Sequence, residues 1–163
     1  MIALASEMDG PMTIGEISWQ RAGSYGSETG YYYGFKLYMG AAAGSELTNT
    51  FAENYVHGTR TLVYSTAAQQ MTALPDRWMT VLLDTPYYYS GTEDLIIELE
   101  WVGGSNMFYT YMWDTGTNRG LMNKSDVGSP TGILLATMSE LMFGPASVLE
   151  QRTFGSIKAV WAD

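Results

Sequence analysis

The chain has 163 residues, 46% of them apolar and only 15% charged, and its 17 acidic and eight basic side chains give a formal net charge of −9. This charge balance leaves no basic stripe for a phosphate backbone and argues against nucleic acid as a partner. The length suits one core, and no linker-like stretch divides the chain, so we expect a single domain over 1–163. Cysteine is absent, so the fold must form without disulfides.

The chain has 18 glycines, 12 tyrosines and five tryptophans, a composition typical of an all-β protein with tight turns. The first predicted strand covers 12–20 and places Ile17 and Trp19 on one face and Ile14 on the other. The second covers 31–39, where large apolar side chains at odd positions predict a core strand with Tyr33 facing inward.

A short helical segment is predicted between the second strand and the third. Leu47, Phe51 and Tyr55 are spaced by four residues behind Ser45, which is a suitable N-cap. We therefore expect one or two short helices here, and strand again from Thr61 to Ser65.

The clearest strand signal of the chain lies at 95–101. Leu95, Ile97 and Leu99 alternate with Ile96, Glu98 and Glu100, a period of two that an extended strand with one buried face explains. An apolar strand at 78–84 precedes it, separated by three tyrosines and a glycine turn.

Towards the C-terminus, 108–113 alternates and 154–161 reads as the last strand. Residues 133–143 fit helical spacing as well as strand spacing, and both interpretations stay open. Successive strands with turns between them predict an all-β, antiparallel β-sandwich.

The order of several short segments resembles that of an uncharacterised β-sandwich module of secreted, multidomain bacterial surface proteins. The segments that carry this resemblance are Leu62–Ser65, Trp78–Val81, Leu83–Tyr89, Gly91–Glu98 and Gly155–Val160. The module has phenylalanine where this chain has Tyr87, and asparagine where it has Ser90. The resemblance covers roughly 34–101 well and implies a jelly-roll-like topology and an extracellular or cell-surface location. It brings no established activity.

Glu98 and Glu100 are the two residues whose spacing suits a catalytic pair. Glu98 and Glu100 stand two residues apart on one strand face, so their backbones are ~6.5 to 7 Å apart, near the separation that paired carboxylates need in glycoside hydrolysis. The stretch also looks like the strand motif of laminarinase-type sandwich hydrolases, but Ile96 stands where that motif has its nucleophile. His57 is the lone histidine and follows no nucleophile pattern. We therefore expect no catalytic residues and no enzyme.

No metal motif is present, and we expect neither a metal site nor a cofactor. Calcium is the one ion for which the chain offers ligands, because Asp84, Glu93, Asp94 and Asp114 stand at predicted strand ends or turns. None of these residues follows the Asp-x-Asp-x-Asp spacing of a calcium loop.

Tyrosine clusters are the main candidates for a binding surface. Consecutive strand residues point to opposite faces, so each tyrosine triplet must turn at least one ring away from the core. Such rings stack on sugars or anchor protein interfaces. The candidate ligand or interface aromatics are Tyr32, Tyr88, Tyr109, Tyr111 and Trp113.

Two functions follow from these features. The first is a noncatalytic extracellular structural module that self-assembles into a filament, tubule or surface layer as a homo-oligomer or homopolymer. The second is a carbohydrate-binding or adhesion module that uses an aromatic sheet face to bind polysaccharide. No segment is long and apolar enough to predict membrane insertion. The candidate assembly residues are Ile2, Leu4, Met138, Leu141, Met142, Val160 and Trp161.

Overall fold

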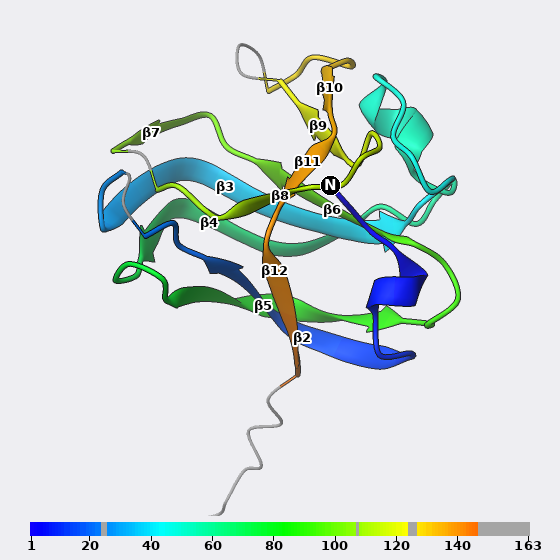
Figure 1. Cartoon of the computed structure of the whole chain (residues 1–163), viewed down its shortest axis with the longest axis horizontal. Helices are drawn as coiled ribbons and strands as arrows, with labels where there is room; N and C mark the ends of the chain where they lie inside the picture. The colour runs from blue at the N-terminus through cyan, green and yellow to red at the C-terminus, as the bar shows by residue number, and fades with distance from the viewer. Residues whose placement is uncertain (24–25, 107, 124–126, 147–163) are drawn as a thin grey trace, which may run out of the picture.

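The computed structural model describes residues 1–23, 26–106, 108–123 and 127–146 and is built almost entirely of β-strands (Figure 1). Its two helices are short 3-10 turns, η1 (Ala5–Glu7) and η2 (Phe51–Asn54). No helix in these described ranges could cross a membrane. The strands are β1 (Ile2–Ala3), β2 (Met12–Gln20), β3 (Thr29–Ala41), β4 (Thr61–Thr72), β5 (Trp78–Tyr89), β6 (Leu95–Glu100), β7 (Gly103–Ser105), β8 (Met112–Asp114), β9 (Gly120–Met122), β10 (Ile133–Leu135), β11 (Thr137–Ser139) and β12 (Leu141–Pro145).

Two antiparallel sheets form the body of the molecule. The larger sheet has the order β1-β6-β3-β4, with β7 also paired to β3, and the smaller sheet has the order β12-β2-β5. Strands β4 and β5 follow each other in sequence and lie against one another, so they close one side of the body. The all-β sandwich is thereby confirmed, whereas the jelly-roll topology stays a prediction.

The main core lies between the two sheets. Burial of large aliphatic and aromatic side chains from both sheets drives this packing, at about 1.5 to 3 kcal/mol for each fully buried side chain. Phe35, Leu37 and Met39 of β3 and Leu95 and Ile97 of β6 are all buried, as their alternation predicted. From the smaller sheet the core receives Ile14, Ile17, Trp19, Met79, Val81 and Tyr89.

Two predicted face assignments are wrong, because local irregularities shift the alternation. Tyr33 was expected inside but is exposed, whereas its neighbour Tyr32 packs against the core. The change occurs at Gly34, whose φ of 60° is a conformation that other residues adopt only with strain. Ile14 was expected opposite Ile17 but shares its core, because the pairing of β2 with β5 shifts register after Ile14.

A second apolar cluster covers the other face of the larger sheet near β6. Ile96 packs there with Ile2, Ala42, Leu47 and Tyr55. The predicted helical turns around 45–55 are reduced to η2, which follows Thr50 rather than Ser45. This end of the larger sheet is therefore covered on both faces.

Residues 133–145 form strand rather than helix, which resolves the ambiguity of their pattern. The segment descends through the molecule as β10, β11 and β12, pairing in turn with β9, β8 and β2 (Figure 1). The predicted strand at 108–113 is shorter than expected, since only β8 and an isolated bridge between Thr110 and Arg21 form there. The predicted strand at 154–161 lies outside the described residues.

Candidate interaction surface

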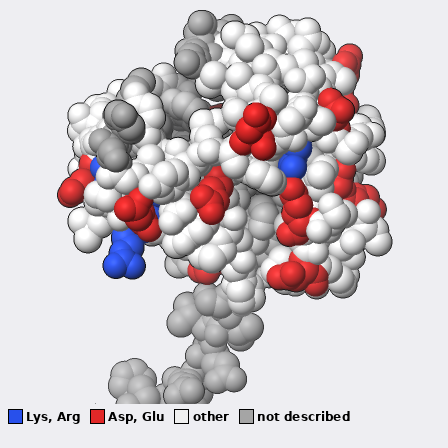
Figure 2. Space-filling model, in the orientation of Figure 1, with Lys and Arg blue, Asp and Glu red and all other residues white. Residues whose placement is uncertain are grey.

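A groove of about 590 Å³ opens between β12 and the N-terminal segment that carries β1 and η1. In Figure 2 this region is a hollow near the middle of the face, with acidic side chains around it. The residues that line the groove are Ala3, Glu7, Met8, Asp9, Met12, Trp113, Met138, Glu140, Leu141, Met142 and Phe143. We call this surface the β12 groove.

The floor of the β12 groove is apolar and rich in methionine. Met8, Met12, Leu141 and Phe143 each pack against the main core, so the groove reaches down to the interior of the sandwich. Methionine is flexible and polarizable, and its side chains adapt to the shape of a partner. Met142 is 45% exposed at the groove. The floor is therefore suited to apolar side chains brought by another segment.

Three carboxylates give the β12 groove a negative border. Glu7, Asp9 and Glu140 are exposed and belong to its lining. The hydrogen bond from Arg119 holds the pKa of Glu7 below its usual 4.5, so this carboxylate carries its charge at neutral pH. Arg119 compensates the charge of Glu7, so the remaining negative charge of the border comes from Asp9 and Glu140, and it would attract a partner with basic side chains.

Arg119 fixes one wall of the groove from behind. Its guanidinium group is almost fully buried, donates to the Ile2 carbonyl from Nε at 3.2 Å and from Nη2 at 3.0 Å, and donates from Nη1 to Glu7 at 2.8 Å. A second ion pair joins Nη2 to the same carboxylate. The guanidinium carbon also lies 5.2 Å from the ring centroid of Trp113, a cation–π contact. One side chain thus positions β1, η1 and Trp113 together.

The outer edge of β12 has no strand partner among the residues that the structure describes. In the smaller sheet β12 pairs with β2 alone, so its other side presents unpaired backbone groups. Unpaired backbone edges are the usual place for strand addition. The β12 groove therefore lies beside both apolar side chains and a free backbone edge.

The structure divides the predicted assembly residues into three groups. Met138, Leu141 and Met142 line the β12 groove, although Met138 is itself nearly fully buried. Trp113, one of the predicted ligand or interface aromatics, lines the same groove. Ile2 is buried inside the second apolar cluster and Leu4 packs against it, so neither belongs to an open surface. Val160 and Trp161 lie outside the described residues.

The predicted aromatic surface is only partly assembled. Tyr109 and Tyr111 are exposed, and the Tyr111 hydroxyl donates to Asp76 Oδ1 at 2.5 Å. Tyr88 is 69% exposed on β5. Tyr32 is not available, because its ring packs edge-on against Trp101 at 5.6 Å and its hydroxyl accepts a hydrogen bond from the Phe108 amide.

Several exposed or site-forming residues were missed at the sequence level. Tyr31 and Tyr33 are exposed on β3, while the middle member of that triplet is not. The sequence around Arg119 contains no motif that predicts its structural role, because single basic residues are common in polar stretches of this kind. Met8 and Met12 belong to a second methionine-rich segment of the sequence, like 138–142. This shared enrichment is the signal that could have predicted them as groove residues.

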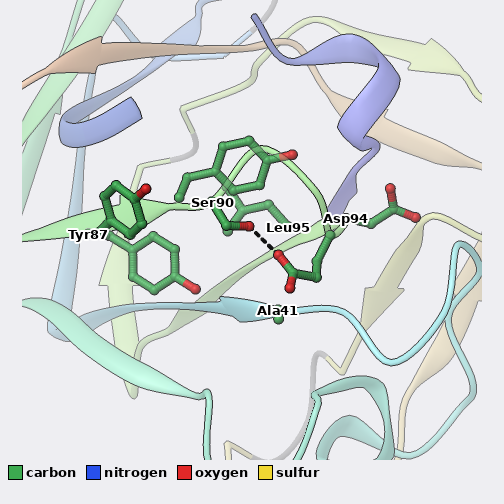
Figure 3. Close-up of a pocket in the computed structure, with 8 residues that line it drawn as sticks. Ala41, Tyr87, Ser90, Asp94 and Leu95 are labelled. Atoms are coloured by element: carbon green, nitrogen blue, oxygen red, sulfur yellow. Dashed lines mark hydrogen bonds between the residues drawn. The ribbon is translucent and has the colours of Figure 1, made fainter. Parts of the chain in front are cut away.

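The second tyrosine triplet lines a small pocket of about 110 Å³ (Figure 3). Ser90 and Glu93 line the same pocket, and the Ser90 hydroxyl donates a hydrogen bond to the Glu93 carboxylate, drawn as the dashed line in Figure 3. The Thr92 hydroxyl also donates to Glu93, and the hydrogen bonds from Ser90 and Thr92 lower the pKa of this carboxylate. The Glu93 carboxylate is therefore bound by hydroxyl groups of the turn to which it belongs.

The acidic residues considered for calcium do not converge. Asp84 accepts a hydrogen bond from the Ser65 amide, Asp94 from the Ala5 amide and Asp114 from the Gly116 amide. Within the described part of the chain, no three His, Cys, Asp or Glu side chains form a group that could hold a metal. The expectation of no metal, with calcium as its alternative, stays a prediction.

Glu98 and Glu100 do share a face, and Arg60 joins them. Arg60 Nη2 lies 2.7 Å from Glu98 Oε1 and 2.8 Å from Glu100 Oε1, and the Tyr55 hydroxyl donates to Glu98 Oε2 at 2.8 Å. Burial alone would raise the pKa of Glu98, but the hydrogen bonds from Arg60 and Tyr55 outweigh it and hold that pKa below 4.5.

Glu98 does not fit the acid of a glycoside-hydrolase pair. The acid of such a pair needs a raised pKa so that it keeps a proton at neutral pH, whereas the pKa of Glu98 is lowered. The Glu98 side chain is also only 12% exposed. His57 is exposed in a turn and does not join the cluster. Arg60 thus holds both glutamates as an ion-pair cluster on one face of β6.

Comparison of the chain with protein-family models, with curated proteins and with solved structures finds no match.

Proposed function

We propose that this protein is a noncatalytic extracellular structural module that self-assembles into a homopolymer such as a filament, tubule or surface layer. The observation that carries this proposal is the β12 groove, where an unpaired strand edge and a methionine-rich apolar floor lie side by side. Edges of this kind are templates for pairing with another chain unless they are covered.

The charge of the chain shapes how such copies can meet. With a net charge of −9, two copies repel one another at long range, so association requires a specific contact rather than general stickiness. The groove supplies apolar surface for such a contact, within the acidic side chains that Figure 2 shows around it.

The test is the assembly state of purified protein, measured by light scattering and electron microscopy. Wild-type protein is expected to form polymers, and Met142→Glu to shift the population to monomers, because it adds a fourth carboxylate to the groove. Leu82→Glu is the matched control, since Leu82 is also exposed but lies on β5, away from the groove. A monodisperse wild-type monomer at micromolar to millimolar concentration would contradict the proposal.

Carbohydrate binding is the second candidate, favoured by one specific observation. Tyr109, Tyr111 and Trp113 are each between 38% and 47% exposed at alternate positions of one segment, and exposed aromatic rings can stack on sugars. Binding of wild-type protein to a glycan array, lost in Tyr109→Ala and retained in Tyr88→Ala, would favour this function over assembly.

A further inference from the structure

The β12 groove marks the side on which the sandwich is open. On the opposite side, β4 of the larger sheet and β5 of the smaller sheet lie against each other. On the groove side the edges are β1 and β12, and both contribute to the lining through Ala3 and through Leu141, Met142 and Phe143. The main core is thus reachable from this side, and a single added strand would cover it.

The chemistry of the groove fits an extended segment with alternating side chains. An added strand gains affinity from main-chain hydrogen bonds to the free edge and specificity from side chains at alternate positions. Those side chains would be apolar where they face Met12, Leu141 and Phe143 on the floor. Basic side chains would be favoured beside the carboxylates of the border.

Residues 154–161 have this composition. Gly155, Ile157, Ala159 and Trp161 alternate with Phe154, Ser156, Lys158 and Val160, a period of two with one largely apolar face. Between 151 and 162 there are two basic residues, Arg152 and Lys158, and no acidic one. In a chain with a net charge of −9, this segment is complementary to the acidic border of the groove.

We infer that the β12 groove binds residues 154–161 of a second copy of this chain, added as a strand along the free edge of β12. The inference rests on the proposed self-assembly and names its contact. Seven residues, 147–153, separate this segment from Ala146 and could span up to about 24 Å. Each copy then fills one groove and offers its own to a third copy.

Such a contact joins two different surfaces and therefore propagates. Head-to-tail interfaces of this type produce open filaments or closed rings, depending on the rotation between copies. Trp161, on the same face as Ile157 and Ala159, would bury roughly 150 to 250 Å², the usual area of an aromatic side chain. The other side chains of this face would add to that area toward the ~800 Å² per partner of a standard interface.

Cysteine trapping tests the contact directly, because the natural chain has no cysteine. Two single-cysteine copies with tags of different size are co-expressed, one carrying Met142→Cys and the other carrying Ser156→Cys, Ile157→Cys or Lys158→Cys in turn. After mild oxidation we expect a disulfide-linked heterodimer for at least one of the three positions. The control replaces Met142→Cys by Leu82→Cys, which is exposed at the other edge of the smaller sheet, and should give at least tenfold less heterodimer.

The outcomes separate this inference from the proposed function. A double variant with both cysteines on one chain that gives only an internal disulfide would show the segment in its own groove and overturn the second copy as occupant. Polymers in electron micrographs without heterodimers above the control would overturn the groove contact but leave self-assembly standing. Monomers without heterodimers would overturn both.

Discussion

Replacement of Arg119 by methionine tests whether a buried guanidinium group holds the wall of the β12 groove. Methionine keeps the unbranched stem but removes the donors to the Ile2 carbonyl and to the Glu7 carboxylate. Breaking a buried ion pair by removing one partner costs about 3 to 5 kcal/mol. Because Glu7 is about one-third exposed and can regain water, we expect the lower end, a loss of about 3 kcal/mol.

Urea denaturation and thermal melting followed by circular dichroism measure this loss. For a domain of this size, 3 kcal/mol corresponds to a fall in Tm of roughly 6 to 12 °C. The pKa of Glu7 is lowered in the folded state, so the pair stabilises the protein above pH 4.5 and loses this effect as the pH falls through the folded-state pKa. The difference between wild type and Arg119→Met should therefore be smaller at pH 3 than at pH 7.

Arg77→Met is the matched control, since Arg77 is exposed and its replacement should change the free energy of unfolding by no more than about 0.5 kcal/mol. If Arg119→Met loses less than about 1 kcal/mol at pH 7, the ion pair does not anchor β1 and η1. A loss of the same size at pH 3 and pH 7 would show that packing rather than charge is responsible.

Three further substitutions test other parts of the fold. Gly34→Ala should lower the free energy of unfolding by about 1 to 2 kcal/mol in thermal melts, because φ at Gly34 is 60° and the new Cβ would lie 3.0 Å from a Val102 methyl carbon. Gly103→Ala is the control and should change the free energy little, because its Cβ would have no neighbour within 4 Å. Tyr89→Ala should lose about 3 to 5 kcal/mol in urea denaturation, because the ring is 3% exposed; equal effects for Tyr88→Ala would contradict this. Glu98→Gln should lower the free energy of unfolding by roughly 1 kcal/mol at pH 7. Because the pKa of Glu98 is lowered in the folded state, the wild type should lose this advantage as the pH falls below 4.5. A difference that stays constant across pH would rule out the ionised carboxylate as its cause.

The strands and their inward faces could be predicted where local alternation is regular. Leu95 and Ile97 of β6 face the core as their spacing required, and so do Leu37 and Met39 of β3. A period of two is a property of neighbouring residues, since successive side chains of a strand point to opposite faces. Short-range pattern was therefore sufficient for the all-β sandwich.

The positions of individual tyrosines could not be predicted in the same way. One glycine with positive φ, Gly34, accompanies the exchange of Tyr32 and Tyr33 between core and surface. A shift in pairing between β2 and β5 likewise brings Ile14 to the core beside Ile17. Both depend on backbone geometry that the alternation itself does not encode.

Sequence alone determined that the polypeptide folds as β-strands without disulfides, and it marked Trp113, Leu141 and Met142 as surface candidates. Only the tertiary structure decided that 133–145 is extended, because its pattern suits helix and strand equally and the pairing with β9, β8 and β2 settles the choice. The tertiary structure also decided that these candidates border one groove beside Ala3, more than 100 residues away in the chain. Contacts over such separations arise from the order of strands in the sheets, and side-chain periodicity carries no information about that order.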